Sequence, residues 1–534
     1  MNFSWLSCGK AGLAVGFSQI GGTGDRRALI SVSDKTGALD FAKGLLALGY
    51  GLVSTGGTYG HIRHLGGVVS VEDATGFPEI LGGRVKTLHP KIHGGILARR
   101  DESGHMAALG EHGIPPIDLV AVNLYPFAKT LGRRGATEEE IIENIDIGGV
   151  ALIRSAAKNH ASVTVVVDPE DYPAVLDELA GGGISPATRK ALAAKAFRHT
   201  AEYDSLIAWH LNLDAGGLGG GYPEKLTMQY ELKQKLRYGE NPHQSAAIYK
   251  QAGQLDMGIF AAQQLHGIEL SYNNAADADM ALGLIAEFAG PACAVIKHQN
   301  PCGVGLGETA QEAFREAHAA DPVSIFGGIV AFNREVDEAA ALLLKPVFLE
   351  IILAPAFSPG ALGMLRKKKN LRLLRTDRLP MLWEHRLAGI NGGLLVQDAD
   401  TARLDPSKFA FPTQKKPTDE EMKWAQFAWK VAKHAKSNAI VVAKGGRTLG
   451  IGAGQTSRVG AAKIALAQAG GAARGAALAS DAMLPMPDTA ELAADAGISA
   501  IIQTGGSVKD EEVIAACDRR GVAMAFTGLR HFRH

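Results

Sequence analysis

The run ALISVSDKTGALDFAKGLLALGYGLVSTGGT, residues 28–58, decides the class of fold. It begins with a short apolar stretch that ends in polar residues, continues with a helical pattern through Leu45, and returns to a second apolar stretch at 49–54. IDLVAVNLYPF (117–127) and ASVTVVVD (161–168) repeat the same type of stretch further along the chain. Short Val/Ile/Leu runs alternating with helical patterns are typical of a parallel sheet buried on both faces. The sequence therefore predicts an α/β fold that binds ligands at the carboxyl ends of its strands.

The chain of 534 residues is too long for one ordinary core, so we expect two to four domains. The clearest break is DAGGLGGGYP at 214–223, where the glycine density removes any helix or strand pattern. We therefore predict a poorly ordered extension at 1–25, a first domain at 26–213, a linker at 214–223 and a second domain at 224–534. We see no internal repeat that the sequence alone establishes.

Composition excludes several classes of protein. The 55 Lys and Arg balance the 55 Asp and Glu, so no positive field is left to hold a nucleic-acid backbone. No run approaches the ~18 to 20 apolar residues that span a bilayer. The cysteines, Cys8, Cys293, Cys302 and Cys517, lack the spacing of a disulfide framework or a zinc site. We expect a soluble, cytoplasmic protein without a metal, nucleic-acid or membrane partner.

Polar residues gather at predicted strand ends and loops of the first domain. The turn Ser54–Thr58 follows a strand and opens a helix, where free backbone N–H groups favour a phosphate, although a Gly-Gly turn there is more often only structural. Other polar runs are SVSDKTG (31–37), GGRVKTLHP (82–90), NLYPF (123–127), DIGG (146–149) and RSAAKN (154–159). Each run alone is weak, but together they form a candidate nucleotide site.

These runs resemble the inosine monophosphate (IMP) cyclohydrolase domain, which is related to methylglyoxal-synthase-like folds, from Arg27 to about Leu179. The resemblance implies ring closure of FAICAR, the formylated aminoimidazole carboxamide ribotide, with loss of water. It also implies Lys158 as general acid/base, Lys86 as the stabiliser of developing charge, and Tyr125 and Asp146 as residues that orient the carboxamide and relay protons. The implied nucleotide-binding residues are Ser33, Asp34, Lys35, Thr55, Gly56, Gly57, Thr58, Arg84, Thr87, Asn123 and Ile147.

The second domain carries the sharpest signal, AVIKHQNPCGVG at 294–305. An apolar strand delivers Lys297 and His298 directly into a turn at the edge of a sheet. A lone histidine is most often buried and hydrogen-bonded, but a neighbouring cation favours the neutral imidazole that can accept a proton, and the ammonium can stabilise an oxyanion. Those are the two roles that attack of an aromatic amine on a formyl carbon requires.

This run, LRYGENPHQ (236–244), LSYNNAAD (270–277) and DPVSIFGGIVAFN (321–333) resemble the aminoimidazole carboxamide ribotide (AICAR) formyltransferase domain, up to the C-terminal TGLRHFRH. The resemblance implies two α/β subdomains similar to cytidine deaminases but without zinc, and the run Pro301–Gly305 indeed lacks the second cysteine of a Pro-Cys-x-x-Cys signature. It also implies 10-formyltetrahydrofolate as cosubstrate, no metal, and a homodimer whose formyltransferase sites form across the subunit interface.

The resemblance assigns His298 as proton acceptor, Lys297 as transition-state stabiliser and Asn438 as an assisting residue. It implies AICAR contacts by Arg237, Tyr238, Gly327, Glu350, Met483 and Arg530. It implies folate contacts by Arg458, Val459, Asp488, Ser507 and Val508. One departure is SDAMLPMPD (480–488), where Met483 and Leu484 stand in place of the family's usual paired phenylalanines, so we expect altered affinity rather than lost activity.

Two other functions remain open at this point. One is a standalone cyclohydrolase, or a methylglyoxal-synthase-like phosphate eliminator, with a degenerate C-terminal half. The other is a regulatory module that senses nucleotides and turns nothing over. The number of catalytic-type residues favours the bifunctional AICAR formyltransferase/IMP cyclohydrolase family, which catalyses the last two steps of de novo IMP synthesis.

Overall fold

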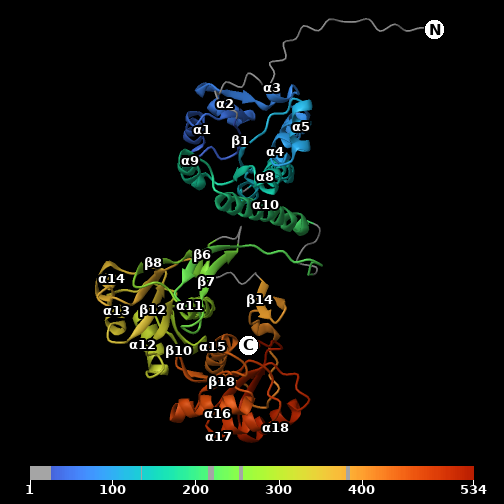
Figure 1. Ribbon diagram of the computed structural model, residues 1–534. Coiled ribbons are helices and arrows are strands. Elements are labelled where there is room, and N and C mark those ends of the chain that lie inside the picture. Colours follow the sequence, from blue (N-terminus) through green and yellow to red (C-terminus); the bar gives the residue numbers. More distant parts are fainter. Residues whose placement is uncertain (1–25, 134, 215–221, 252–255, 380–384) are drawn as a thin grey trace, which may run out of the picture. The chain divides into compact units, whose positions relative to one another are not determined.

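The computed structural model describes residues 26–133, 135–214, 222–251, 256–379 and 385–534. The chain divides into two compact units, residues 1–229 and 230–534 (Figure 1). The extension predicted at 1–25 and most of the linker predicted at 214–223 lie outside the described residues. Among the residues described, no helix has the length and apolarity that crossing a membrane would need.

The first unit is built on a five-stranded sheet in the order β3-β2-β1-β4-β5, and all of its strand pairs are parallel. The strands are β1 (Arg27–Val32), β2 (Gly51–Ser54), β3 (Val68–Ser70), β4 (Leu119–Asn123) and β5 (Thr164–Val166). The helices are α1 (Ala38–Ala47), α2 (Gly56–Ile62), α3 (Val71–Thr75), α4 (Pro90–Leu97), α5 (Ser103–Glu111), α6 (Phe127–Leu131), α7 (Glu138–Glu143), α8 (Gly148–Lys158), α9 (Tyr172–Ala180) and α10 (Pro186–Asp214). This confirms the predicted parallel α/β domain.

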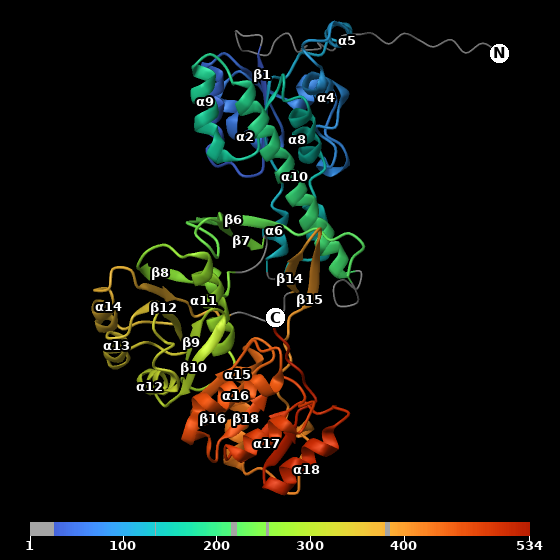
Figure 2. The same ribbon diagram turned by 60° about the horizontal axis from the view of Figure 1, so that its bottom comes forward.

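Both faces of this sheet are buried, as the apolar strands predicted. Successive residues of β1, such as Leu29 and Ile30, enter two separate cores because side chains alternate across a strand. One core holds α1 and α9, whose Phe41 and Tyr172 rings stack with centroids 4.2 Å apart. The other holds α4, α8 and the long helix α10, which runs beside α8 (Figure 2). The helix layers on the two faces of the sheet hold in place the loops at the carboxyl ends of β1, β2 and β4.

The second unit contains one continuous mixed sheet in the order β20-β19-β18-β16-β17-β10-β9-β11-β12-β13-β8. Its strands are β8 (Gln263–His266), β9 (Ala292–Lys297), β10 (Asn300–Leu306), β11 (Gly328–Phe332), β12 (Leu349–Ala354), β13 (Arg372–Arg375), β16 (Ile440–Lys444), β17 (Arg447–Gly452), β18 (Ala477–Ser480), β19 (Ala500–Gln503) and β20 (Ala523–Phe526). Two separate hairpins are β6 (Tyr230–Leu236) with β7 (Ala246–Gln251), and β14 (His385–Ile390) with β15 (Gly393–Asp398).

The large sheet consists of two halves with the same topology. Each half has an antiparallel hairpin followed by three strands that are mutually parallel, in the orders β10-β9-β11-β12-β13 and β17-β16-β18-β19-β20. The halves join where β10 and β17 run antiparallel. Helices α11 (Tyr272–Ile285) and α15 (Asp419–Lys433) share one core on one face. Two further cores hold α12 (Ala310–Ala320), α13 (Glu338–Leu344) and α14 (Pro359–Leu365), and α16 (Arg458–Ala469), α17 (Asp488–Asp495) and α18 (Asp510–Arg520).

Matching glycines mark the same position in the two halves. GVGLGET (303–309) and GIGAGQT (450–456) each end a hairpin and lead into a helix. A Cβ atom on Gly305 would lie closer than 3.0 Å to the backbone of α12, and one on Gly452 would overlap the backbone of α16 in the same way. Because only glycine permits this approach, the two runs are a repeat with one structural cause, which sequence inspection alone had not found.

Candidate active sites

A cavity of about 640 Å³ opens at the carboxyl ends of β1, β2 and β4 in the first unit. The cavity is lined by most of the residues for which the sequence indicated nucleotide binding. Those that line it are Ser33, Lys35, Thr55, Gly56, Gly57, Thr58, Arg84, Lys86, Thr87, Asn123, Tyr125, Asp146 and Ile147. Ligand binding at this edge is what a parallel α/β sheet favours.

Asn123 organises the loop that follows β1. Its side-chain oxygen accepts hydrogen bonds from the backbone N–H groups of Ser33 at 2.5 Å and Asp34 at 2.9 Å, and its amide donates to Asp34 O at 3.0 Å. Asp34 is not among the cavity-lining residues, and its carboxylate instead caps a turn at Thr36, whose hydroxyl and backbone N–H hold the pKa of Asp34 below its usual value. Asn123 and Asp34 therefore shape the cavity through the backbone of this loop.

Lys35 is drawn into the same loop. Its ammonium donates to the carbonyl oxygens of Val32 and Ser33, and its partial burial lowers the pKa of Lys35 from the ordinary value. Burial penalises the charged form of an amine, whereas an incoming phosphate would favour it. Lys35 is therefore suited to respond to an anionic ligand.

The loop at 82–89 carries two cations into the cavity. Lys86 Nζ lies 3.0 Å from a Glu79 carboxylate oxygen, and a Cβ atom on Gly56 would lie 3.6 Å from that same Nζ. Arg84 forms an ion pair with Glu143, the last residue of α7. The loop thus brings a lysine against the glycine turn at 55–58, and each of its two cations already has a carboxylate partner.

Asp146 is held at the back of the cavity by backbone donors. Its carboxylate accepts from Gly149 N at 2.7 Å and from Tyr125 N at 3.3 Å, while burial raises its pKa above the ordinary value. The Tyr203 hydroxyl accepts from Asp146 N at 2.9 Å and donates to Asn144 O at 2.6 Å. Sequence reasoning missed Tyr203, because a tyrosine 57 residues away within a long helix gives no motif signal.

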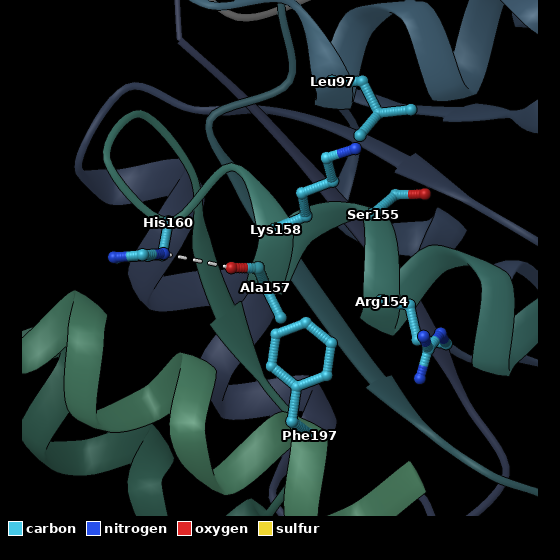
Figure 3. Close-up of a pocket in the computed structure, with 7 residues that line it drawn as sticks. All are labelled: Leu97, Arg154, Ser155, Ala157, Lys158, His160 and Phe197. Atoms are coloured by element: carbon cyan, nitrogen blue, oxygen red, sulfur yellow. Dashed lines mark hydrogen bonds between the residues drawn. The ribbon is translucent and has the colours of Figure 1, made fainter.

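Lys158 is not brought to this cavity within one chain. It ends α8, whereas Gly148 at the cavity begins that helix, and ten residues at ~1.5 Å per residue place them about 15 Å apart. Lys158 instead lines a separate depression of about 480 Å³ with Leu97, Arg154, Ser155, Ala157, His160 and Phe197 (Figure 3). The length of the helix was the sequence signal for this separation.

One edge of the large sheet gathers the residues proposed for formyl transfer. The antiparallel pairing of β9 with β11 places Lys297, at the end of β9, beside the start of β11 near Gly327. The parallel pairing of β11 with β12 brings the start of β12, with Glu350, to the same edge. On the other side, the start of β16 near Asn438 lies beside the ends of β17 and β18. The ends of β19 and β20 continue the same edge toward 504–508 and 527–530. The topology thus brings segments from both halves to one edge.

His298 and Gln299 form the two-residue turn between β9 and β10, with φ values of 55° and 54°. Two consecutive positive φ angles in such a loop usually require Asn or Gly, and side chains held this way cluster at functional sites. Gln299 N donates to Asp277 Oδ1 at 2.7 Å, and burial raises the pKa of Asp277. Asp277 therefore fixes the turn from α11, a role that sequence reasoning missed.

Neighbouring hydrogen bonds tie this turn to its surroundings. Lys297 Nζ donates to Phe326 O at 2.8 Å, which places the ammonium beside Gly327. The Asn300 side chain donates to His298 O at 3.2 Å and accepts from Lys436 N at 3.1 Å. Since Lys436 lies two residues before Asn438, the turn and the Asn438 segment are joined through Asn300.

Arg458 is buried. Its guanidinium donates to Asn438 Oδ1 at 2.6 Å and to Ser480 Oγ at 2.8 Å, and it forms an ion pair with the fully buried Asp481. Asp481 also accepts from Ser437 Oγ at 2.5 Å. Both terminal nitrogens of the guanidinium therefore already have protein partners, and the predicted folate contact of Arg458 stays a prediction.

The remaining proposed ligand contacts differ in their surroundings. Glu350 pairs with the buried Arg372, whose guanidinium lies 2.7 Å from the carboxylate. Met483 is 42% exposed, whereas Leu484 is fully buried in the core with α16 to α18, so of these two residues only Met483 is accessible to a ligand. Arg237, Asp488, Val508 and Arg530 are exposed, and Tyr238, Val459 and Ser507 are half-buried.

No group of three or more His, Cys, Asp or Glu side chains within the described ranges is arranged to hold a metal ion.

The family described as "AICARFT/IMPCHase bienzyme" matches residues 156–468, and an "MGS-like domain" matches residues 37–151.

Curated relatives match nearly the whole chain. "Bifunctional purine biosynthesis protein PurH" of Anoxybacillus flavithermus is 56% identical over 512 residues, which cover 95% of this chain and 100% of the relative. A protein of the same description from Bacillus cereus is 55% identical over the same length and coverage. A solved structure described as "Crystal structure of ForH" is 40% identical and covers 34% of this chain and 95% of its own, with a TM-score of 0.30.

Proposed function

Because this chain belongs to the AICARFT/IMPCHase bienzyme family, we propose that each of its two units carries one of the two activities, at the sites described above. The enzyme transfers a formyl group to AICAR, giving FAICAR, and closes FAICAR to IMP, which are the final two steps of purine biosynthesis to IMP. Formyl transfer belongs to the sheet edge around His298, and ring closure to the cavity around Asp146. A standalone cyclohydrolase and a purely sensory module are both disfavoured by the family match.

The formyl donor that we propose is 10-formyltetrahydrofolate. The AICAR amine attacks the formyl carbon, His298 accepts the proton that the amine loses, and Lys297 stabilises the oxyanion of the tetrahedral intermediate. The carbon–nitrogen bond to the folate then breaks, the carbonyl re-forms, and the folate nitrogen takes up a proton, giving tetrahydrofolate. This step needs no metal, and we predict that the enzyme holds none.

The observation that supports this assignment is the placement of Lys297 and His298 at a strained two-residue turn. Lys297 Nζ has a backbone carbonyl as its acceptor, a partner that it can exchange for an oxyanion without leaving a carboxylate unpaired. Asn438 is held by Arg458 and by Gln455 O at 2.9 Å, so it is rigid enough to orient a substrate. Gly327, Glu350 and Met483 lie along the same edge and are proposed to contact AICAR.

Ring closure needs a proton acceptor for the attacking carboxamide nitrogen and a donor for the departing water. We assign the first role to Asp146, because its raised pKa makes a carboxylate a stronger base. The protonated Asp146 that results then returns the proton to the departing hydroxyl, which leaves as water. Lys86 and Tyr125 line the same cavity and are assigned to charge stabilisation and orientation of the carboxamide. Ser33, Lys35, Thr55 to Thr58 and Arg84 are assigned to the phosphate and ribose.

We also propose that the chain acts as a homodimer, as the family resemblance implied. Lys158 ends its helix about 15 Å from the start of that helix at the cavity, so a catalytic Lys158 would have to serve the cavity of a second copy. The alternative is that Lys158 takes no part in the reaction. Mixing Lys158→Ala subunits with subunits that lack Lys86 distinguishes these two possibilities.

The test of the two-site assignment uses purified full-length chain with AICAR and 10-formyltetrahydrofolate, following tetrahydrofolate and IMP together. His298→Ala should abolish tetrahydrofolate release but still cyclise added FAICAR, and Lys86→Ala should do the reverse. A single substitution that stops both reactions in a folded protein would rule out the division of activities between the units.

A further inference from the structure

Arg84 and Glu143 form an ion pair at the mouth of the cyclohydrolase cavity, and both side chains line that cavity. They come from different elements, since Arg84 belongs to the loop before α4 and Glu143 ends α7. The side chains are 67% and 50% exposed, so water reaches both partners. The pair therefore occupies a position that an entering ligand must pass or disturb.

The other two cations that line this cavity, Lys35 and Lys86, are not paired with a carboxylate that lines the cavity. Lys35 donates to two backbone carbonyls, and Lys86 pairs with Glu79, which is not among the cavity-lining residues. Glu143, in contrast, faces the cavity together with the arginine that it holds. The Arg84 guanidinium, which hydrogen-bonds to it, holds the pKa of Glu143 below its usual value, so the carboxylate stays ionised at neutral pH. A phosphate bound at Arg84 would consequently meet a fixed negative charge.

We propose that Glu143 is a displaceable counter-ion that sets the affinity of the cyclohydrolase cavity for phosphorylated ligands. This inference rests on the proposed function, which assigns Arg84 to the nucleotide phosphate. An arginine fork binds a phosphate through two parallel hydrogen bonds, and a phosphate dianion attracts it more strongly than one carboxylate does. The entering phosphate displaces Glu143 from Arg84, and the carboxylate then repels the bound phosphate until the product leaves. Glu143 thus weakens binding of IMP and promotes its release.

The direct test is Glu143→Gln in the full-length enzyme, assayed by cyclisation of FAICAR with IMP as product inhibitor. The amide keeps the size of the side chain but removes the charge, and Glu143 is exposed, so the variant should fold. Removing one exposed charge beside a phosphate should lower both the KM for FAICAR and the inhibition constant of IMP about three- to ten-fold. The gain should shrink with added salt, because exposed charges are screened.

Inosine, which lacks the phosphate, separates a charge effect from a change of shape. It should inhibit the wild-type enzyme and Glu143→Gln equally. Glu111→Gln, an identical change of charge at the exposed end of α5, should alter neither KM nor inhibition by IMP. The proposal is overturned if Glu143→Gln leaves inhibition by IMP unchanged or weakens it. It is also overturned if the substitution strengthens inhibition by inosine as much as inhibition by IMP.

The Arg84→Gln variant distinguishes failure of the counter-ion proposal from failure of the assignment of Arg84 to the nucleotide phosphate. If IMP inhibits Arg84→Gln as strongly as the wild-type enzyme, Arg84 does not hold the phosphate and the proposed function is wrong at this residue. If Arg84→Gln weakens inhibition by IMP but Glu143→Gln does not strengthen that inhibition, only the counter-ion role fails. When Glu143→Gln is added to Arg84→Gln, its effect on inhibition by IMP should fall below two-fold if the two residues act through each other.

Discussion

The Arg458 guanidinium donates a 2.6 Å hydrogen bond to the side-chain oxygen of Asn438. The same guanidinium pairs with Asp481, whose side chain is fully buried, so the two charges compensate each other out of water. Asn438 is one of the residues assigned to formyl transfer. We therefore propose that Arg458 is a positioning residue that orients Asn438 from within the protein.

Arg458→Lys should lower kcat for formyl transfer at least about ten-fold, because an ammonium lacks the planar fork that reaches Asn438, Ser480 and Asp481 together. The KM for 10-formyltetrahydrofolate should change less than kcat, and cyclisation of added FAICAR should be unchanged. Steady-state kinetics of both reactions would check this. A raised KM for the folate with kcat intact would instead point to direct contact with the ligand.

Arg458→Met should cost about 3 to 5 kcal/mol of unfolding free energy, since it leaves the buried Asp481 carboxylate without its cationic partner. Urea unfolding of the full-length chain at neutral pH measures this cost. A loss below about 1 kcal/mol would mean that water or another cation reaches Asp481.

The parallel sheet and most of the first cavity could be predicted because they depend on local pattern. Apolar strands with polar residues at their ends indicate both the sheet and the edge where a ligand binds. The residues that escaped prediction hold the site from far along the chain: Tyr203 lies 57 residues from Asp146, and Asp481 lies 23 residues from Arg458. Such pairings depend on how strands and helices are stacked, which no local motif contains.

Tyr203→Phe should slow cyclisation about ten-fold and leave formyl transfer unchanged. The substitution removes the hydroxyl that accepts from Asp146 N and donates to Asn144 O, and two unpaired backbone groups cost about 1 to 3 kcal/mol each when they stay buried. The segment that presents Asp146 would then loosen. Cyclisation assayed with added FAICAR measures the effect, and tetrahydrofolate release by the same preparation is the internal control. Equal loss of both activities would show general unfolding instead.

Gly452→Ala should destabilise the second unit by about 3 kcal/mol or more. The new Cβ would overlap the backbone of α16, which cannot move aside as a side chain could, and Gly305→Ala should behave alike against α12. Gly363→Ala is the matched control, because nothing lies within 4 Å of its added Cβ in α14 and helices favour alanine. The urea unfolding midpoints of the three variants measure these differences in stability. A neutral Gly452→Ala would contradict the shared packing role of the two glycine runs.

Acid should destabilise the second unit through Glu287. Burial alone would raise the pKa of Glu287, but hydrogen bonds and charges from His434 and Lys433 lower it to about 2 from 4.5. A carboxyl with a lowered folded-state pKa contributes its stability above the unfolded value and loses it as pH falls toward the folded value. The loss between about pH 4.5 and 2 amounts to about 3 kcal/mol. Burial also lowers the pKa of His434, so proton uptake by the unfolded chain adds to the loss from about pH 6.5 downward.

Glu287→Gln should be less stable than the wild-type chain at pH 7 and should lose less stability on acidification. Urea unfolding at pH 7, 5 and 3.5 gives both quantities. Glu511→Gln, on the exposed side of α18, removes the same charge and should follow the wild-type pH dependence. Parallel pH curves for Glu287→Gln and the wild-type chain would rule out the buried Glu287–Lys433–His434 cluster as the source.

Mixing two inactive variants should show where Lys158 acts. If Lys158 serves the cavity of a second copy, Lys158→Ala and Lys86→Ala should each cyclise FAICAR poorly alone. Equal mixing after dissociation and reassembly makes half of the dimers mixed, and each mixed dimer holds one cavity with both lysines intact. About a quarter of the wild-type cyclisation rate should then return, a fraction fixed by subunit statistics for a two-fold dimer. Full activity of Lys158→Ala alone would remove Lys158 from the mechanism. An inactive Lys158→Ala that mixing cannot rescue would show that the lysine is needed within its own chain, against the about 15 Å separation along α8.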